Sequence, residues 1–184
     1  MQNSNASSRS IGQRTAVVGC CGVGKSTLAR RIAARTGQRY VNADEIFWLP
    51  GWVQRPKPEY RRMLTEMLSG DGWVFDGNIG SNREIALPRI DTLIWLDYSW
   101  GTTMSRLLRR TVRRAWTKEE IFSGNRESWR QSFASKESIL LFAWGAYGDY
   151  RTRYQQMFAD LPEHISYAVR LTSPRDAETF VRSL

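Results

Sequence analysis

Residues 14–36 read RTAVVGCCGVGKSTLARRIAART, and the fold can be worked out from this stretch. It opens with a short apolar run that ends in glycine, which predicts a buried strand entering a tight turn. Over residues 26–36, Leu28 and Ile32 are spaced as on one face of a helix, and Gly37 predicts the end of that helix. The sequence therefore predicts a strand, a glycine-rich loop and a helix in direct succession.

The loop between this strand and helix, Gly19–Ser26, matches the pattern G-x-x-x-x-G-K-[ST] at every position. Its glycines let successive backbone N–H groups point inward as an anion nest, and the helix N-terminus adds partial positive charge there. We therefore predict a P-loop that binds the phosphates of ATP, with Lys25 on the β- and γ-phosphates and the Ser26 hydroxyl on Mg²⁺. The residues predicted to contact the nucleotide here are Gly19, Cys20, Cys21, Gly22, Val23, Gly24, Lys25, Ser26 and Thr27.

The rest of the chain alternates between apolar runs and helical patterns. The predicted strands are 39–44 (RYVNAD), 73–77 (WVFDG), 92–97 (TLIWLD) and about 164–171 (HISYAVRL). The predicted helices are 59–68, 102–116 and about 175–184, with amphipathic segments at about 127–145 and 149–161. Residues 46–58, rich in proline and aromatics, predict an irregular exposed segment. This alternation indicates an α/β fold whose parallel sheet is covered by helices on both faces.

The composition is that of one compact domain. With 184 residues, 41% of them hydrophobic, we expect a single domain over residues 14–184 after a loose, disordered polar tail over residues 1–13. No run approaches the roughly 18 apolar residues of a membrane span. The two cysteines are adjacent in the loop, as a reducing compartment tolerates, so we expect a cytoplasmic protein. The net charge of +9 favours anionic partners, which the phosphates of a nucleotide satisfy as well as nucleic acid does.

Acidic residues end three of the predicted strands, at Asp44, Asp76 and Asp97. Ligands of doubly wound sheets bind beyond the carboxyl ends of the strands, so all three are candidates to border one crevice. Mg²⁺ usually keeps several waters and takes one or two carboxylates. Asp76 and Asp97 both fit that position at this point, and each is alternatively a helix cap or turn former.

Segments spread over nearly the whole chain from Arg14 resemble adenylate-kinase-like P-loop proteins, in particular the group called DNA topology modulation proteins. These segments are VVGCCGVGKSTLARRIA, NADEIFWLPGW, WVFDGN, DTLIWLD, RLLRRTVRR and YAVRLTSPRDAETF. The resemblance implies a three-layer P-loop NTPase fold with five parallel strands in the order 2-3-1-4-5. It also implies an acceptor-binding insert at about residues 45–70 and an arginine-rich lid at about residues 115–130.

The same resemblance assigns roles to single residues. Asp76 in WVFDGN matches the Asp-Gly of nucleoside monophosphate kinases, which favours Asp76 over Asp97 as the metal ligand. Asp44 matches a carboxylate that contacts the phosphoryl acceptor in small-molecule kinases, and Pro174 matches a segment that packs near the nucleotide base. The run DGNIG at 76–80 departs from the Asp-Gly-Phe-Pro-Arg of nucleoside monophosphate kinases, which weakens the case for AMP as the acceptor.

The predicted helix at 102–116 is unusually rich in arginine. Its arginines are Arg106, Arg109, Arg110, Arg113 and Arg114. Helical geometry places all of them but Arg109 on one face, and the predicted buried side consists of Leu107, Leu108, Thr111 and Val112. Arginines that close on a γ-phosphate stabilise the charge of phosphoryl transfer. We therefore predict catalytic roles for Arg110, Arg114 and, beyond a mobile lid loop, Arg126. A solvated basic face is one alternative, and contact with nucleic acid through stacking of Trp116, Trp129 and Phe133 is another.

Together these features predict an ATP-dependent phosphotransferase that acts on a small-molecule acceptor. The loop and Mg²⁺ hold ATP, Asp44 positions or activates the acceptor, and the arginines neutralise the developing charge. A nucleotide-dependent regulatory protein that binds nucleic acid and a simple NTPase are the alternatives. No motif in the chain specifies the acceptor.

Overall fold

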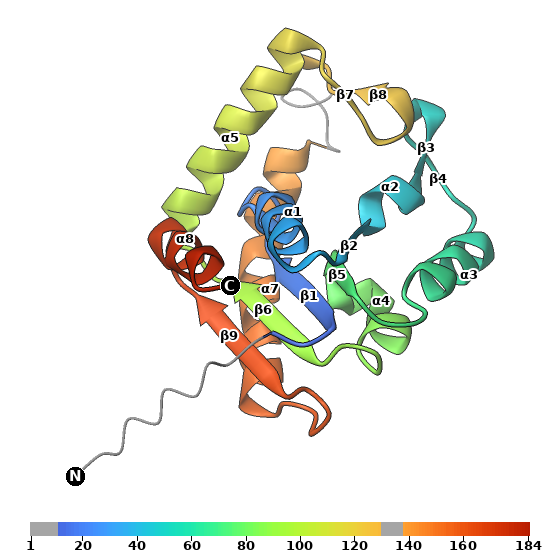
Figure 1. The fold of residues 1–184 in the computed structure, drawn as a ribbon. Coiled ribbons are helices and arrows are strands. Elements are labelled where there is room, and N and C mark those ends of the chain that lie inside the picture. The colour runs from blue at the N-terminus through green and yellow to red at the C-terminus, as the bar shows by residue number, and fades with distance from the viewer. Residues whose placement is uncertain (1–10, 130–137) are drawn as a thin grey trace.

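The computed structural model describes residues 11–129 and 138–184, and its centre is one parallel sheet (Figure 1). The strands of this sheet are β1 (Arg14–Gly19), β2 (Arg39–Asn42), β5 (Trp73–Asp76), β6 (Thr92–Leu96) and β9 (Tyr167–Leu171). Their order across the sheet is β2-β5-β1-β6-β9, and every neighbouring pair is parallel. Counted along the chain among themselves, these five strands read 2-3-1-4-5, since β3, β4, β7 and β8 lie in two separate hairpins.

Helices cover both faces of the sheet, which confirms the predicted P-loop α/β architecture. The covering helices are α1 (Lys25–Thr36), α3 (Lys57–Met67), α4 (Ile79–Ala86), α7 (Ile139–Ala159) and α8 (Pro174–Arg182). In β1, Val17 packs with α1 and α8, whereas its neighbours Ala16 and Val18 pack with α3, α4 and α7. This alternation follows from the period of two along a strand, and it divides the core into two apolar layers. In the described part of the chain, no helix combines the length and apolar character of a bilayer span.

Two short hairpins lie beyond one end of the sheet and contact each other (Figure 1). The first follows α2 (Ala43–Phe47) and consists of β3 (Trp48–Leu49), η1 (Pro50–Trp52) and β4 (Val53–Gln54). The second consists of β7 (Glu120–Ile121), η2 (Phe122–Gly124) and β8 (Asn125–Arg126). The buried Asn125 side chain joins them, because it accepts from the Trp52 amide at 2.9 Å and donates to the Leu49 carbonyl at 2.9 Å.

Several predicted boundaries need correction. The strand predicted over 39–44 ends at Asn42, because the Asn42 side chain accepts a hydrogen bond from the Asp44 amide at 2.9 Å and caps α2. The segment 46–58, predicted to be irregular, contains the end of α2, the first hairpin and the start of α3. The separate segments predicted at 127–145 and 149–161 include one continuous helix, α7, since Gly145 and Gly148 do not interrupt it. Residues 130–137 lie outside the described residues.

The predicted tail over residues 1–13 is only partly described. Residues 1–10 lie outside the described residues. Gly12 donates its backbone N–H to the Thr92 hydroxyl at 2.8 Å, and Gln13 donates to the Asp91 carboxylate at 3.1 Å. The last residues of the predicted tail are therefore fixed against the edge of the domain.

The arginine-rich helix, α5 (Trp100–Thr117), buries Leu107 and Thr111 as predicted, but not Leu108 and Val112. Leu108 and Val112 are 46% and 39% exposed, and the buried stripe instead consists of Thr103, Leu107, Thr111 and Ala115. That stripe recurs every four residues because α5 meets the phosphate loop and α7 along one narrow line. Arg106, Arg110 and Arg114 flank the stripe and are half-buried, whereas Arg113, predicted on their face, is exposed beside Arg109.

Candidate functional site

The loop between β1 and α1 has a backbone that only glycine adopts easily. Gly19, Gly22 and Gly24 have φ angles of 145°, 80° and 112°, in the left-handed region. A Cβ atom on Gly22 would lie 2.5 Å from the Cβ of Leu107, and one on Gly19 would lie 2.6 Å from the carbonyl oxygen of Leu96. The loop is therefore packed tightly between the sheet and α5, as a close cradle around phosphates requires.

We expect Gly22→Ala to destabilise the protein and to weaken ADP binding, because the new methyl group overlaps Leu107 of α5. Gly37→Ala is the matched control, since Gly37 also has a positive φ of 71° but a Cβ atom added there would have no neighbour within 4 Å. The overlap at position 22 should cost about 1–3 kcal/mol more than the control. Chemical denaturation of both variants measures this difference, and equal losses would contradict the packing described here.

The Lys25 side chain lies back across the loop. Its Nζ donates to the carbonyl oxygens of Gly19 at 2.9 Å and Cys20 at 3.1 Å. This places the ammonium group at the mouth of the anion nest, beside the free N–H groups of the first turn of α1. The side chain of Cys20, a residue of the loop, is buried. Burial raises the pKa of its thiol to about 11, so this cysteine is a neutral packing group at pH 7.

The two predicted metal ligands, Ser26 and Asp76, both lie near the hydroxyl of Tyr40 of β2. Asp76 ends β5 and is 4% exposed, and its Oδ2 accepts a hydrogen bond from the Tyr40 hydroxyl at 2.6 Å. Ser26, in the first turn of α1, is close enough to lower the pKa of the same phenol. Burial, followed by the neighbouring Asp76 carboxylate, raises the pKa of Tyr40, so the phenol stays protonated and donates.

This pair of oxygen donors fits Mg²⁺, which takes hard oxygen ligands and keeps several waters. In the described ranges no group of three His, Cys, Asp or Glu side chains could hold a metal ion by itself. A hydroxyl and one carboxylate beside a phosphate cradle are the protein's expected share of a site that nucleotide phosphates and water complete.

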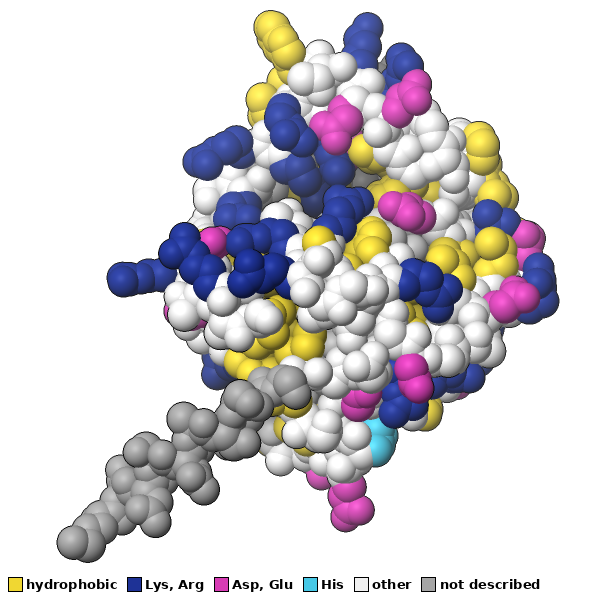
Figure 2. All heavy atoms as spheres, viewed as in Figure 1, with side chains coloured by type: hydrophobic (Ala, Val, Ile, Leu, Met, Phe, Trp, Pro, Cys, Tyr) yellow, Lys and Arg dark blue, Asp and Glu magenta, His cyan; other side chains and the backbone are white. Residues whose placement is uncertain are grey.

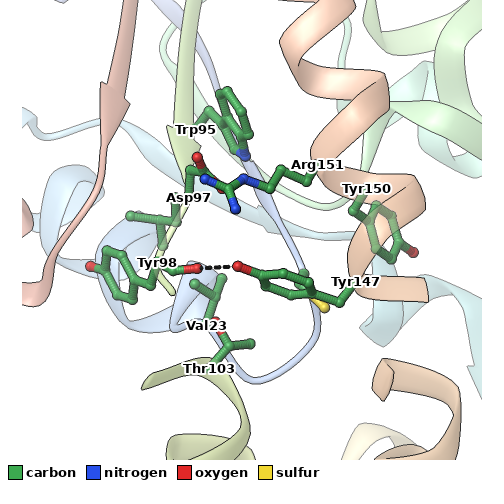
Figure 3. Close-up of a pocket in the computed structure, with 10 residues that line it drawn as sticks. Val23, Trp95, Asp97, Tyr98, Thr103, Tyr147, Tyr150 and Arg151 are labelled. Atoms are coloured by element: carbon green, nitrogen blue, oxygen red, sulfur yellow. Dashed lines mark hydrogen bonds and ion pairs between the residues drawn. The ribbon is translucent and has the colours of Figure 1, made fainter. Parts of the chain in front are cut away.

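Asp97, the alternative metal ligand, is used differently. Its Oδ1 lies 3.3 Å from the guanidinium of Arg151, and its Oδ2 accepts from Nε of Arg170 at 2.9 Å. Figure 3 shows the carboxylate beside Arg151 at a small cavity behind the phosphate loop, where the Tyr147 hydroxyl donates to the Tyr98 carbonyl at 2.8 Å. Both oxygens of Asp97 are therefore occupied by ion pairs, and Asp76 is the acid that neighbours Ser26.

Asp44 faces the phosphate loop from the first turn of α2. The groups that act on its charge are Lys25, Asp76 and Arg110, which belong to three other elements and share one crevice with it. Solvent still reaches the residue, but burial by the surrounding protein is the main effect and raises the pKa of Asp44. The cations Lys25 and Arg110 oppose that rise.

Arg110 and Arg114 reach this crevice from the flank of α5. Nη1 of Arg114 forms an ion pair with Oε1 of Glu127 at 3.1 Å, and both side chains are largely buried. Burial is the main effect on Arg110 and lowers its pKa, with the neighbouring Arg114 acting in the same direction. Nε of Arg110 is buried and has no hydrogen-bond partner among the described residues. The guanidinium of Arg110 therefore stands between the Arg114–Glu127 pair and Asp44 with unused hydrogen-bonding capacity.

The remaining predicted site residues lie further out. Arg126 pairs with Glu120 on its own hairpin and is more than half exposed, so among its described contacts none involves the phosphate loop. Pro174 begins α8, directly after the capping box formed by Ser173 and Asp176. Hydrogen bonds from Ser173 and Thr172 lower the pKa of Asp176.

Further residues that were given no predicted role in the site also contact the loop. Asn78 accepts from the Gly19 amide at 3.2 Å and from the Tyr154 hydroxyl at 3.0 Å, which ties the start of the loop to α7. Arg106 lies over the loop, 3.0 Å from where a Cβ on Gly24 would stand, and 5.9 Å from the ring centroid of Tyr98. In the sequence, Asn78 stood out only as part of the DGNIG run that departs from the nucleoside monophosphate kinases. No local pattern indicated a role for Tyr40 or Tyr98.

Comparison with known proteins finds similarity to several kinases. No protein-family model matches the chain. It is 32% identical over 117 residues to a shikimate kinase of Nitrobacter winogradskyi, covering 55% of this chain, and spans about half (55%) of that relative's length. The structure is similar to that of shikimate kinase from Acinetobacter baumannii in complex with shikimate, with a TM-score of 0.54 and 18% identity over 92% of this chain and 89% of the other. It is also similar to a gluconokinase from Sinorhizobium meliloti 1021, with a TM-score of 0.53 and 16% identity over 95% and 90% of the two chains.

These likenesses give no support to the nucleic-acid alternative, and the resemblance to DNA topology modulation proteins stays a prediction. The structural likeness extends over nearly the whole of both chains. It agrees with the phosphate loop and the five-stranded sheet described above. The chain therefore has the fold of the P-loop kinases of small molecules.

Proposed function

We propose that this protein is an ATP- and Mg²⁺-dependent phosphotransferase that transfers the γ-phosphoryl group to a hydroxyl of a small acceptor. The observation that carries the proposal is the position of the Asp44 carboxylate. It lies in one crevice with Lys25 of the phosphate loop, Asp76 of the metal site and Arg110 of α5. A P-loop that only hydrolyses ATP has no need of a second carboxylate of raised pKa near its phosphate lysine and an arginine.

The donor side consists of the phosphate loop, Lys25, Ser26 and Asp76. The amides of residues 19–27 cradle the α- and β-phosphates, and Lys25 leaves its two loop carbonyls for the β- and γ-phosphates. Ser26 and Asp76 would hold Mg²⁺, which would supply positive charge to neutralise the phosphates. Figure 2 shows Lys and Arg side chains gathered on the side of this face where α1, α5 and α8 lie in Figure 1, a field that attracts a polyanion such as ATP. The Tyr98 and Pro174 region lies where the base would pack.

On the acceptor side, Asp44 accepts the proton of the attacking hydroxyl or aligns that hydroxyl with the γ-phosphorus. A carboxylate with a raised pKa is a stronger base than an ordinary aspartate, which suits it to this task. Arg110 and Arg114 neutralise the charge that develops on the transferred group. Arg126, whose guanidinium pairs with Glu120 in this structure, joins them only if the second hairpin moves.

In this proposal each of the two hairpins belongs to a functional segment. Residues of about 45–70 form the acceptor insert, and residues of about 115–130 form the lid. The contact between the hairpins through Asn125 supports a shared role, because it joins the two segments directly. The acceptor is a small hydroxylated compound, as the names of the shikimate kinase and the gluconokinase imply for those proteins.

The direct test is a phosphotransfer screen with ATP and Mg²⁺. The acceptor panel includes hydroxy acids, sugars, nucleosides and nucleoside monophosphates, and ADP release is measured with and without each acceptor. We expect ADP release that depends on one class of acceptor and a phosphorylated product detectable by mass spectrometry. Release of ADP at one rate whatever the acceptor, with free phosphate as the product, would make the protein an NTPase and end the kinase proposal.

The pH profile of the same reaction reports on Asp44. Because the base must be ionised and burial raises its pKa, we expect kcat to fall, as pH is lowered, at a pH above the range of an ordinary aspartate. Arg110→Ala removes a cation that opposes the rise, so this acid limb should move to still higher pH. Arg109→Ala, on the exposed side of α5, is the matched control and should leave the limb in place. If neither substitution moves the acid limb of the kcat profile, Asp44 is not the titrating base.

A further inference from the structure

We infer that Tyr40 is a positioning residue for the magnesium site, whose hydroxyl fixes the Asp76 carboxylate in place. The inference rests on the proposed function, because it takes Mg²⁺ to be bound with the nucleotide at Ser26 and Asp76. It adds to that function a residue from β2, a strand that supplies none of the predicted metal ligands.

One short hydrogen bond carries the inference. The Tyr40 hydroxyl donates to Oδ2 of Asp76 at 2.6 Å, a short distance typical of a phenol on an ionised carboxylate. Ser26 is close enough to the same phenol to oppose the rise in its pKa. Tyr40 thus neighbours both predicted metal ligands, at the end of β5 and in the first turn of α1.

The ring that carries this hydroxyl is held from both sides. Tyr40 packs in the apolar layer between the sheet and α1, with Val74 of β5 beside it in the register of the two strands. The guanidinium carbon of Arg30 lies 4.9 Å from the ring centroid, and Arg30 is itself 3.9 Å from Oε1 of Glu45. The phenol is therefore oriented before any ligand arrives, which a positioning role requires.

The two oxygen atoms of the Asp76 carboxylate have different roles. Tyr40 occupies Oδ2, and Oδ1 has no hydrogen-bond partner within the described ranges, so Oδ1 is the atom available to the metal or to a metal-bound water. Loss of such an outer partner typically lowers metal affinity about 10- to 100-fold.

The test compares calorimetric titrations of ADP in excess Mg²⁺ and in EDTA, because ADP needs no acceptor and is not consumed. The variants are Tyr40→Phe, which removes one oxygen atom, and Tyr167→Phe. Tyr167 is the matched control, since it is a half-buried strand tyrosine in the same apolar layer, stacked on Phe180. For the wild type and the control we expect ADP to bind more tightly with Mg²⁺ than without it. For Tyr40→Phe we expect unchanged affinity in EDTA and a loss of the Mg²⁺-dependent gain by roughly 10- to 100-fold.

The outcomes separate this inference from the proposed function. A Tyr40→Phe protein that keeps the full Mg²⁺-dependent gain overturns the positioning role, while the phosphate site stands. Equal losses with Mg²⁺ and with EDTA also overturn it, because they show a structural role alone. Wild-type protein that binds no ADP under either condition refutes the proposed function itself. Asp76→Asn provides a second variant: if Tyr40 acts through Asp76, adding Tyr40→Phe to it lowers Mg²⁺-dependent binding no further.

Discussion

Replacing Lys25 by alanine should lower phosphotransfer by about 10³-fold or more, the largest effect we expect from any single side chain. Electrostatic groups aimed at developing charge are typically worth about 10²–10³ each, and Lys25 also neutralises the bound triphosphate before the reaction. Its ammonium group stands at the mouth of the loop, 2.9 Å from the Gly19 carbonyl. Steady-state kinetics at saturating ATP, with the acceptor found in the screen, measures the loss.

The matched control for this change is Arg35→Ala. Arg35 is a cation in the last turn of the same helix, α1, and its guanidinium donates to the Arg182 carbonyl at 3.2 Å, away from the loop. Its removal lowers the net charge by the same amount. Because its one hydrogen bond is exposed and lies away from the loop, turnover should stay within about twofold. If Lys25→Ala turned over at the wild-type rate, the assignment of the loop as the donor site would be wrong.

Replacing Asp44 by asparagine should have the second largest effect, a fall in kcat of about 10²–10⁴-fold, the range for loss of a general base. Asparagine keeps the size of the side chain and its place in the first turn of α2, so ATP binding should be little changed. A fall in kcat with an unchanged affinity for ADP would identify Asp44 with the acceptor rather than with the donor. An equal fall in nucleotide affinity would contradict that assignment.

Asp44→Asn lowers kcat, but it should not lower the stability of the folded protein at pH 7. The folded-state pKa of Asp44 is raised, so the folded protein binds the proton more tightly than the unfolded chain does. The ionised carboxylate therefore costs stability above the raised pKa, and this cost disappears as pH falls below the pKa of the unfolded chain. We expect Asp44→Asn to be at least as stable as the wild type at pH 7 and to lose that advantage in acid. Urea denaturation at both pH values measures the difference.

The fold was predictable because its main signals are local. A strand, a loop of the P-loop pattern and a helix follow one another in residues 14–36, and three of the four later sheet strands have an acid at or just beyond their end. The predicted boundary at Asp44 was wrong, because Asn42 ends β2 and caps α2, so Asp44 lies in the first turn of that helix. Asp44 nevertheless lies at the predicted edge of the sheet, because α2 begins directly where β2 ends.

What the sequence could not predict depends on contacts between distant segments. Tyr40 meets Asp76 only because β2 pairs with β5 across 36 positions, and no local pattern marks such a partner. The face of α5 was misjudged for the same reason: exposed Leu108 and buried Thr111 both fit an amphipathic helix until α7 fixes which side is covered. Arg126 lies on a hairpin of two-residue strands, too short for any periodicity to reveal.

The Asn125 amide has a consequence for how the two hairpins can move. Its side chain holds the Trp52 amide and the Leu49 carbonyl of one hairpin, and it donates to the Phe122 carbonyl of its own hairpin at 2.8 Å. Any motion that parts the two hairpins has to break the bonds to Trp52 and Leu49 together, at a residue that is 5% exposed. The Ser123 hydroxyl adds a further bond between the hairpins, to the Trp48 carbonyl at 2.6 Å. Because these bonds have to break together, the two hairpins should separate in one cooperative step.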